Sequence, residues 1–454
     1  MIALGYDSIE SSGDGTRLRV MPNCPEPAGR YQNYTIGQFS LMPGVELERT
    51  AVLVRERRPF VYPLELTWDW SRTLTSGPRS MGHGIPSGVL DSIRNGRASL
   101  LFFLIESVSP MPDEHSPIWL FDHMQRLVVE QELPPERVWF ASSHVRALDG
   151  FAIWLNGRGL YEPEAFRLRA LQPCASIVRA QYHANAQGWD LEINCDPQDL
   201  ALTMVKTRFS ADDFAARYVR PEELDAERRA GAMRPKRFLA MNRHRWAHRV
   251  HVTTYLAGRG YLDDSLVSFP ETSPDYYDHF PAPVLDEFLR ASWLKLQARL
   301  PLIIDEGAPP AGGITPDNFM KLKNGWPYRQ SYFNIASETV LTPPPFHTEK
   351  VMKAVVNLQP FLVVAAPETL RYLRAIGFKT FGRVFDEDYD LPADLPTRMT
   401  RIFQTIDRLG APTPGQARDL YVECRAELEH NRAHLIEGPH QIERLWAEIL
   451  AQLP

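Results

Sequence analysis

The chain alternates short apolar runs with stretches whose apolar residues recur every three or four positions. The run Ser99–Glu106 is almost entirely apolar and predicts a strand that is buried on both faces. Pro117–Leu133 follows with helical periodicity, and Arg137–Ser143 predicts another strand after the break at Pro134 and Pro135. This order of elements indicates an α/β structure built in layers.

The second half of the chain repeats the alternation more regularly. Lys236–Asn242 predicts a strand, and Ala247–Leu262 predicts the helix that follows it. Two more strand and helix pairs follow, with strands at Ser331–Glu338 and Pro360–Ala366 and helices at Thr348–Leu358 and Pro367–Gly377. Such alternation is typical of right-handed parallel crossovers in a doubly wound sheet.

Length and composition indicate more than one domain. The 454 residues exceed what one hydrophobic core usually holds. The segment Ser210–Pro235 is charged and rich in alanine, and we interpret it as the connection between domains. We therefore expect an N-terminal α/β domain at residues 1–225, a C-terminal α/β domain at 236–411, and two helices within 412–454 that pack across the junction.

Charge and cysteine content narrow the class of protein. The chain is 44% hydrophobic and 23% charged, which is typical of a globular protein, and its net charge is −6. This balance gives no overall attraction to nucleic acid, so we expect no stable nucleic acid complex. Four scattered cysteines without a CxxC pair indicate neither a disulfide scaffold nor a zinc site (Cys24, Cys174, Cys195 and Cys424).

The sequence shows no signal peptide pattern and no apolar run long enough to span a membrane. We therefore expect a cytoplasmic protein without a transmembrane segment, and the pattern leaves association with a membrane surface open.

A first group of chemically informative residues follows the strand Lys236–Asn242. Arg243, Arg245, His248 and Arg249 crowd the turn and the first turn of the next helix. Cations are disfavoured at the amino end of a helix unless an anion completes the site, and phosphate is the usual anion there. The alternatives are a solvated basic loop, arginines paired with acids elsewhere, or a basic patch that binds nucleic acid.

A second group lies in Ser337–Val355, where three prolines precede Thr-Glu-Lys at the start of a helix. Thr348 suits the N-cap position, and the charge of Glu349 complements the helix dipole. Capping alone explains these two residues but not Lys350 and Lys353, which are cations near a helix start.

A third group follows the strand Ser99–Glu106. Glu106 ends an apolar strand, where burial could raise its pKa into the working range of a general base. The alternative is a half-exposed carboxylate at the start of a loop. The acidic run Asp386–Asp390 could bind a metal ion, although acidic runs on loops are usually solvated, so we expect no metal site.

The first two groups together resemble the alpha-1,3-fucosyltransferase family. In that family a strand ends in Ser-Asn, and an arginine follows seven residues after the Asn. Asn242 and Arg249 have this spacing, with Met241 in place of the Ser. The family then has a strand ending in Glu-Asn-Ser and a helix opening with Thr-Glu-Lys, which Glu338 and Thr348–Lys350 match.

This resemblance, which covers about Lys236 to Phe381, implies the GT-B architecture. That fold has two Rossmann-like domains whose parallel sheets face an interdomain cleft, and the second domain holds a nucleotide-sugar. The implied activity is that of an inverting, metal-independent glycosyltransferase of the hexosyl- or fucosyltransferase type. It would move a sugar from a nucleotide-diphospho-sugar, with GDP favoured, to a hydroxyl of a glycan, and it would need no cofactor.

The resemblance also implies roles for single residues. Arg249 and Lys350 would bind the diphosphate near Asn242, and Glu338 or Glu349 would bind sugar or ribose hydroxyls. Glu106 from the first domain would deprotonate the acceptor hydroxyl. The implied donor site comprises Asn242, Arg243, Arg245, Arg249, Glu338, Thr348, Glu349 and Lys350.

Two other functions remain compatible with the sequence. One is a transferase that acts on protein side chains or modified DNA instead of a glycan. The other is a protein of the same fold that binds a nucleotide or glycan without catalysis.

Overall fold

A computed structural model describes the chain in ranges separated by gaps. The described residues are 2–7, 9–11, 18–20, 44–65, 84–104, 119–142, 146–161, 164–171, 179, 182, 189–195, 202–208, 217–279, 282, 284–304, 325–342, 345, 347–438 and 441–454. The chain forms two compact units, one of Met1–Arg208 with Pro439–Pro454 and one of Phe209–Gly438. The sequence predicted two α/β domains, and this α/β class is confirmed.

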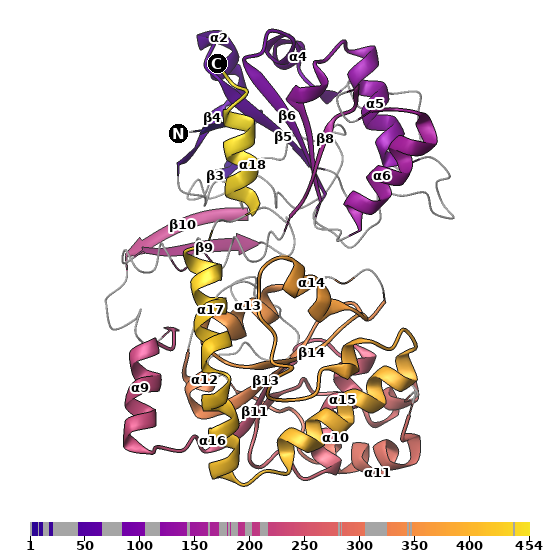
Figure 1. Cartoon of the computed structure of the whole chain (residues 1–454), viewed down its shortest axis with the longest axis vertical. Helices are drawn as coiled ribbons and strands as arrows, with labels where there is room; N and C mark the ends of the chain where they lie inside the picture. The colour runs from indigo at the N-terminus through magenta and orange to yellow at the C-terminus, as the bar shows by residue number, and fades with distance from the viewer. Residues whose placement is uncertain are drawn as a thin grey trace. The chain divides into compact units, whose positions relative to one another are not determined.

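The first unit contains a parallel sheet of six strands in the order β4-β1-β5-β6-β7-β8 (Figure 1). The strands are β1 (Ile2–Tyr6), β4 (Val45–Arg49), β5 (Phe60–Glu65), β6 (Ala98–Leu104), β7 (Val138–Ser142) and β8 (Arg167–Ala170). Two antiparallel pairs accompany this sheet: β2 (Ile9–Ser11) with β3 (Leu18–Val20), and β9 (Trp189–Cys195) with β10 (Leu202–Arg208). The predicted strands at Ser99–Glu106 and Arg137–Ser143 correspond to β6 and β7.

Helices of the first unit share one buried core with these strands. They are α2 (Thr50–Glu56), α4 (Ser87–Arg94), α5 (Leu120–Glu130) and α6 (Ala147–Arg158). The ring of Phe121 on α5 packs edge-on against Phe140 and Phe151, with centroids 6.0 and 5.4 Å apart. Full burial of such side chains stabilises a fold by about 1.5–3 kcal/mol each. The helix predicted at Pro117–Leu133 is α5.

The second unit contains a parallel sheet in the order β12-β11-β13-β14. The strands are β11 (Lys236–Met241), β12 (Leu266–Ser268), β13 (Ser331–Ser337) and β14 (Phe361–Val364). Every residue of β13 is buried, and its polar residue Asn334 is paired there with Gln359, whose Oε1 accepts from Nδ2 of Asn334 at 3.1 Å. All three strands predicted in this half are present, each within two residues of its predicted ends.

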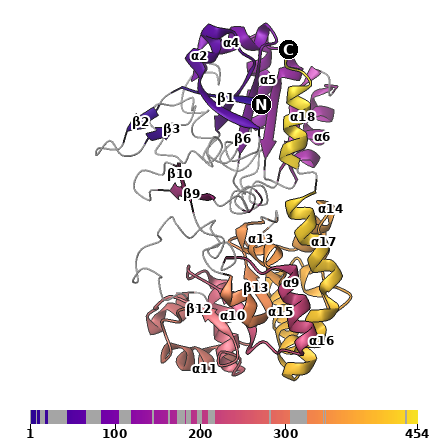
Figure 2. The ribbon, with the colours of Figure 1, turned by 90° about the vertical axis from the view of Figure 1, so that its left-hand side faces the viewer.

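Helices surround this second sheet (Figure 2). They are α9 (Pro221–Ala230), α10 (Ala247–Gly258), α11 (Asp286–Gln297), α12 (Trp326–Gln330), α13 (Glu349–Val356), α14 (Thr369–Ala375), α15 (Leu395–Gly410), α16 (Pro414–Glu423) and α17 (Arg425–Ile436). Helix α10 packs against α11, where the ring of Tyr255 lies 5.7 Å from that of Phe288. Helix α13, which carries Thr-Glu-Lys, packs against α17.

The segment Ser210–Pro235 belongs to the second unit. The sequence placed it between domains at 1–225 and 236–411, whereas the chain divides at Arg208. The reason is that part of the segment forms α9, which polar side chains attach firmly to the second unit.

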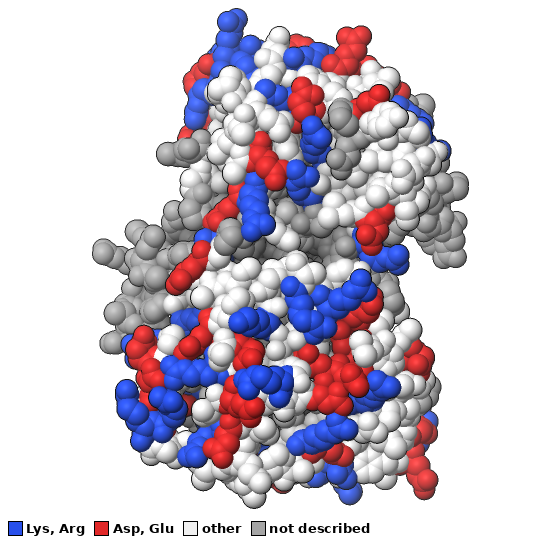
Figure 3. Space-filling view, viewed as in Figure 1, with Lys and Arg blue, Asp and Glu red and all other residues white. Residues whose placement is uncertain are grey.

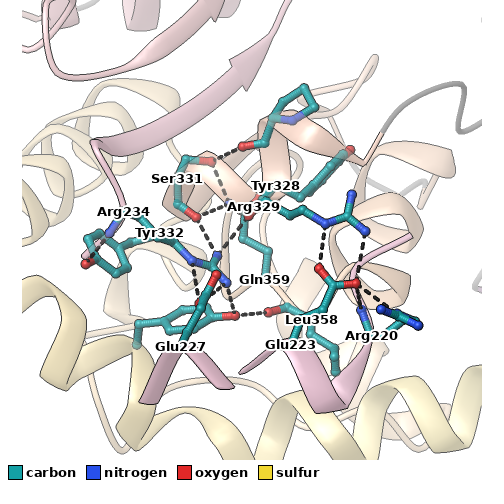
Figure 4. A network of polar contacts seen from close by, with 12 residues as sticks. Arg220, Glu223, Glu227, Arg234, Tyr328, Arg329, Ser331, Tyr332, Leu358 and Gln359 are labelled. Atoms are coloured by element: carbon teal, nitrogen blue, oxygen red, sulfur yellow. Dashed lines mark hydrogen bonds and ion pairs between the residues drawn. The ribbon is translucent and has the colours of Figure 1, made fainter. Parts of the chain in front are cut away.

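A buried network makes this attachment (Figure 4). The guanidinium of Arg329 binds Glu223 of α9, with Nε 2.6 Å from Oε2. Arg234 is 6% exposed and donates to the main-chain oxygens of Tyr328 and Ser331, both at 2.8 Å. Arg234 also binds Glu227 of α9, with Nη2 3.0 Å from Oε2. Both ion pairs are partly buried, and together with the main-chain hydrogen bonds of Arg234 they fix α9 at the amino-terminal edge of the second sheet.

The C-terminal residues are divided between the two units. The sequence predicted two helices within 412–454, whereas the residues that the structure describes there form three, because a break at Cys424 separates α16 from α17. Both of these helices belong to the second unit. Helix α18 (Gln441–Leu450) belongs to the first unit and lies beside its sheet (Figures 1 and 2). There Glu448 accepts a hydrogen bond from Arg169 of β8, with Nε 2.8 Å from Oε2.

Candidate functional site

The second sheet has a topological switch point between β11 and β13. The chain leaves β11, forms β12 on one side of it, and then crosses to form β13 on the other side. Ligands of open α/β sheets bind outside the carboxyl ends of the strands at such a point. Asn242 directly follows β11 and Glu338 directly follows β13. Two of the predicted site residues therefore lie where this topology favours a ligand.

The amino end of α10 adds positive charge at this point. Its N-cap residue Trp246 makes no side-chain hydrogen bond to the helix, and its first turn contains no acidic residue. The helix dipole makes such an end electropositive, and its N–H groups suit an anion. The local sequence therefore adds cations where neutralising acids would normally be found.

Arg249 and His248 extend from α10 to the end of β13. Arg249 is 2% exposed, and its Nη2 donates to the main-chain oxygens of Ser337 and Glu338 at 3.0 and 3.3 Å. Nε2 of His248 lies 2.7 Å from the same oxygen of Glu338. Because a carbonyl oxygen only accepts, this nitrogen carries the proton. Burial, with repulsion from Arg249, lowers the pKa of His248 to about 3, so the ring is neutral near pH 7.

Thr348 links Glu338 to the start of α13. The carboxylate of Glu338 is fully buried and accepts from the main-chain N–H of Thr348 at 2.9 Å and from its hydroxyl. The same hydroxyl caps the helix by accepting from the main-chain N–H of Lys350. Nζ of Lys350 lies 2.9 Å from this hydroxyl and 3.7 Å from Oε2 of Glu338. Thr348 is thus the N-cap that the sequence predicted, and it also orders a carboxylate and an ammonium group.

The two carboxylates of this region have pKa values displaced in opposite directions. Burial raises the pKa of Glu338, and Lys350 offsets only part of that effect. Burial also acts to raise the pKa of Glu349, but attraction to Lys350 and Lys353 outweighs it and lowers this pKa. Oε1 of Glu349 lies 3.1 Å from Nζ of Lys350. Glu349 is therefore firmly ionised, whereas the charge of Glu338 is costly to maintain.

His244 lies in the same loop as Arg243. Partial burial lowers the pKa of His244, and the charges of Arg249, Lys350 and Arg243 lower it further. These cations come from α10, from α13 and from the loop after β11, so distant parts of the sequence meet here. Arg243 and His244 are exposed, so the group opens to solvent. We call the following residues the switch-point cluster: Asn242, Arg243, His244, His248, Arg249, Ser337, Glu338, Thr348, Glu349 and Lys350.

Four buried polar atoms of the switch-point cluster make no hydrogen bond within the described part of the chain. They are Oδ1 of Asn242, Nε of Arg249, Oγ of Ser337 and Oε2 of Glu349. All four residues are at most 4% exposed. Buried polar atoms are normally paired, and each exception calls for an explanation such as a ligand or an ordered water. Since the set includes acceptors and a cationic donor, it suits a ligand with both hydroxyl groups and anionic oxygens.

Arg245 does not join the switch-point cluster, although the sequence grouped it with Arg243 and Arg249. Its guanidinium lies over the ring of Tyr276, 5.2 Å from the centroid. This contact holds the side chain toward the segment Pro274–His279 instead of the end of β13. Glu106, the predicted catalytic base, lies outside the described residues.

The acidic run Asp386–Asp390 is held by internal partners. Glu387 accepts from the hydroxyl of Thr380 at 2.8 Å, and Asp390 accepts from the main-chain N–H of Leu370 at 2.9 Å. Within the ranges that the structure describes, no group of three or more histidine, cysteine, aspartate or glutamate residues could hold a metal ion.

Surface charges elsewhere on the second unit are mutually compensated. Lysine and arginine atoms are interspersed with aspartate and glutamate atoms on the face shown in Figure 3. Arg383 pairs with Glu423 at 3.0 Å and Arg425 with Glu429 at 2.6 Å. Such pairs contribute little to stability but leave no excess charge. In the switch-point cluster, by contrast, three cations are grouped around two carboxylates.

Sequence reasoning missed His244 and underestimated Ser337. A lone histidine in a basic turn carries no periodic or spacing signal, and its importance depends on the approach of Lys350 from another segment. Ser337 reads as an ordinary strand residue because its unpaired hydroxyl is a property of the assembled sheet.

Comparisons with known proteins give limited information. No protein-family model and no curated protein matches the sequence, so the resemblance to fucosyltransferases gains no support there. The solved structures to which the chain is similar include trehalose-6-phosphate from E. coli bound with UDP-2-fluoro glucose, at 11% identity and a TM-score of 0.35, covering 91% of this chain and 76% of that chain.

Two further solved structures resemble the chain to a comparable degree. One is the DNA modifying enzyme beta-glucosyltransferase, at 12% identity and a TM-score of 0.31, covering 95% of this chain and 97% of that chain. The other is UDP-GlcNAc 2-epimerase from Neisseria meningitidis bound to UDP-GlcNAc, at 9% identity and a TM-score of 0.35, covering the whole of both chains. Likeness at these values carries no argument about function, which must come from the site itself.

Across the helices that the structure describes, none is both long enough and apolar enough to cross a membrane.

Proposed function

We propose that the protein is a glycosyltransferase whose switch-point cluster binds the diphosphate of a nucleotide-diphospho-sugar. The observation that carries this proposal is the approach of Arg249 and Lys350 to one residue, Glu338. One contacts its main-chain oxygen at 3.3 Å and the other lies 3.7 Å from its carboxylate. Two cations at a switch point, beside an uncapped helix end, form a site for a strongly charged anion.

The buried atoms without hydrogen bonds suit two parts of the nucleotide-sugar donor, its charged diphosphate and its hydroxyl groups. Nε of Arg249 would donate to a phosphate oxygen, and Lys350 would bind the same diphosphate. Oε2 of Glu349 and Oδ1 of Asn242 would accept from vicinal hydroxyls of the sugar or ribose. Glu338 takes a different role from the one the sequence left open, since both of its oxygens bind Thr348. It positions Thr348 and Lys350 instead of contacting the donor.

The same arrangement supports the chemistry of transfer. The nucleoside diphosphate gains negative charge as its bond to the anomeric carbon breaks, and fixed cations stabilise that charge as it forms. The ordered network of Thr348 and Glu338 holds Lys350 in place beforehand, so little reorganisation is needed during the reaction. We propose an inverting reaction without a metal ion, with a carboxylate of the first unit as base.

Donor and acceptor follow from the resemblance to fucosyltransferases. It favours a GDP-linked sugar as donor and a glycan hydroxyl as acceptor. A hydroxyl of a protein or of modified DNA is the alternative acceptor, and a nucleotide-binding protein without catalysis is the alternative function.

The decisive experiment is thermal unfolding of the full chain with GDP, UDP, CDP and TDP and with their sugar conjugates. A nucleotide present at one hundred times its Kd adds about 2.7 kcal/mol to the free energy of unfolding. We expect one base to give this shift and Arg249→Met to abolish it. A flat response to all four nucleotides would remove the proposal.

Release of nucleoside diphosphate from the stabilising nucleotide-sugar then separates an enzyme from a binding protein. Turnover that Glu106→Gln lowers, without loss of nucleotide binding, would support a transferase. Binding without any release, even with glycan acceptors present, would favour the non-catalytic alternative. Association with DNA or RNA that weakens steeply with salt would instead support the basic-patch interpretation.

A further inference from the structure

The first sheet has its own topological switch point, between β1 and β5. In the order β4-β1-β5-β6-β7-β8 the chain forms β4 on one side of β1 and then β5 on the other. Substrates of open α/β sheets bind outside the carboxyl ends of the strands at this point. Asp7 directly follows β1 there.

Asp7 is distinctive among the neighbouring residues. Of the described residues that directly follow a strand of this sheet, Thr50 and Leu171 are buried and carry no titratable group, whereas Asp7 is an exposed carboxylate. An exposed carboxylate can reach the proton of a hydroxyl that arrives from solvent.

Tyr62 holds this carboxylate in place. Its hydroxyl donates to Oδ2 of Asp7 at 2.6 Å, and Tyr62 itself is fully buried in β5. Packing therefore fixes the hydroxyl, and the hydroxyl fixes one oxygen of an exposed carboxylate.

We infer that Asp7 is the general base for the acceptor hydroxyl and that Tyr62 is its positioning residue. The carboxylate of Asp7 takes the proton as the hydroxyl oxygen bonds to the anomeric carbon. The bond from that carbon to the phosphate oxygen breaks, and its electron pair leaves with the nucleoside diphosphate. This assignment rests on the proposed function and replaces Glu106 in that role.

The test uses the full chain and the nucleotide-sugar whose nucleotide gives the largest thermal shift, with water or a glycan as acceptor. Asp7→Asn should lower kcat by about 100- to 10,000-fold, which is the usual contribution of a general base. The thermal shift caused by the nucleotide should remain unchanged. Asp149→Asn is the matched control, because that aspartate lies on α6 of the same unit with a side chain 67% exposed.

Tyr62→Phe provides a readout that a purely structural role would not give. Loss of the hydroxyl leaves the carboxylate of Asp7 less precisely placed, so kcat should fall about 10- to 100-fold while KM for the nucleotide-sugar stays unchanged. The inference is overturned if Asp7→Asn retains kcat, or if kcat is lost only in Glu106→Gln. Absence of any nucleotide shift in the unmodified chain would instead refute the proposed function itself.

Discussion

Replacing Arg249 with methionine distinguishes an arginine held for a ligand from one that supports the fold. Arg249 donates to two main-chain oxygens, and hydrogen bonds from a charged donor contribute about 1.5–3 kcal/mol each. Methionine has a similar length and removes both bonds. It also removes the cost of burying a guanidinium, which is several kcal/mol. The two effects nearly cancel, so the free energy of unfolding without ligand should change by less than about 2 kcal/mol.

The direction in which the pKa of Arg249 is displaced supports this small change in the free energy of unfolding. Burial lowers the pKa of Arg249, and the attraction of Glu338 and Glu349 does not restore it. The folded protein thus disfavours this charge when no anion is present. A bound diphosphate should stabilise the charge of Arg249. The methionine variant should therefore bind nucleotide about 10- to 150-fold more weakly, corresponding to about 1.5–3 kcal/mol.

Arg234→Met is the matched control. Arg234 is as buried as Arg249, but it lies at the opposite edge of the sheet and binds Glu227, Tyr421 and two main-chain oxygens. Burial acts to lower its pKa, but Tyr421 and Glu227 outweigh that effect and raise it. Its removal takes a charged donor away from all of these partners, which should cost about 3–5 kcal/mol of unfolding free energy. Nucleotide affinity of the folded fraction should be unchanged.

Urea unfolding followed by circular dichroism gives the free energies, and nucleotide titration gives the affinities. The reasoning is refuted if Arg249→Met loses more than about 4 kcal/mol of stability while its nucleotide affinity is preserved. Such a result would show that Arg249 is a structural residue like Arg234.

Three further predictions concern neighbouring residues. Glu349→Gln should weaken nucleotide-sugar binding about tenfold, because an amide accepts more weakly from hydroxyls than a carboxylate does, and calorimetry that shows equal affinity would contradict this role. Thr348→Val should lower the free energy of unfolding by about 2–4 kcal/mol, since it removes a helix cap and a partner of the buried Glu338, whereas Thr348→Ser should restore most of the loss in urea unfolding. Burial lowers the pKa of His347 to about 4, so the unfolded chain binds more protons between about pH 4 and 6.5 and stability falls as pH drops through that window. His347→Gln should remove up to about 3 kcal/mol of this pH dependence, and urea midpoints at pH 7.5 and pH 5 that change equally in both proteins would refute it.

The sequence by itself determined the class of fold and most of its buried strands. Strands of a parallel sheet covered on both faces are mostly apolar, so the apolar centres of Lys236–Asn242 and Ser331–Glu338 could be recognised without any partner. The N-cap at Thr348 was equally readable, because capping depends on residues only two or three positions apart. The boundary between the units could not be predicted from the sequence. The helix within the charged segment Ser210–Pro235 is held by arginine ion pairs that no local pattern reveals.

Only the tertiary structure decided which charged residues act together. Arg245 and Arg249 look alike in the sequence, but one lies in a turn over Tyr276 while the other extends from a helix to the end of β13. The sequence could not decide whether Glu338 or Glu349 contacts the donor. The structure shows that Thr348 donates to both carboxylate oxygens of Glu338. The physical reason is that burial and pairing are set by segments that meet through a crossover, and those meetings are absent from the order of residues along the chain.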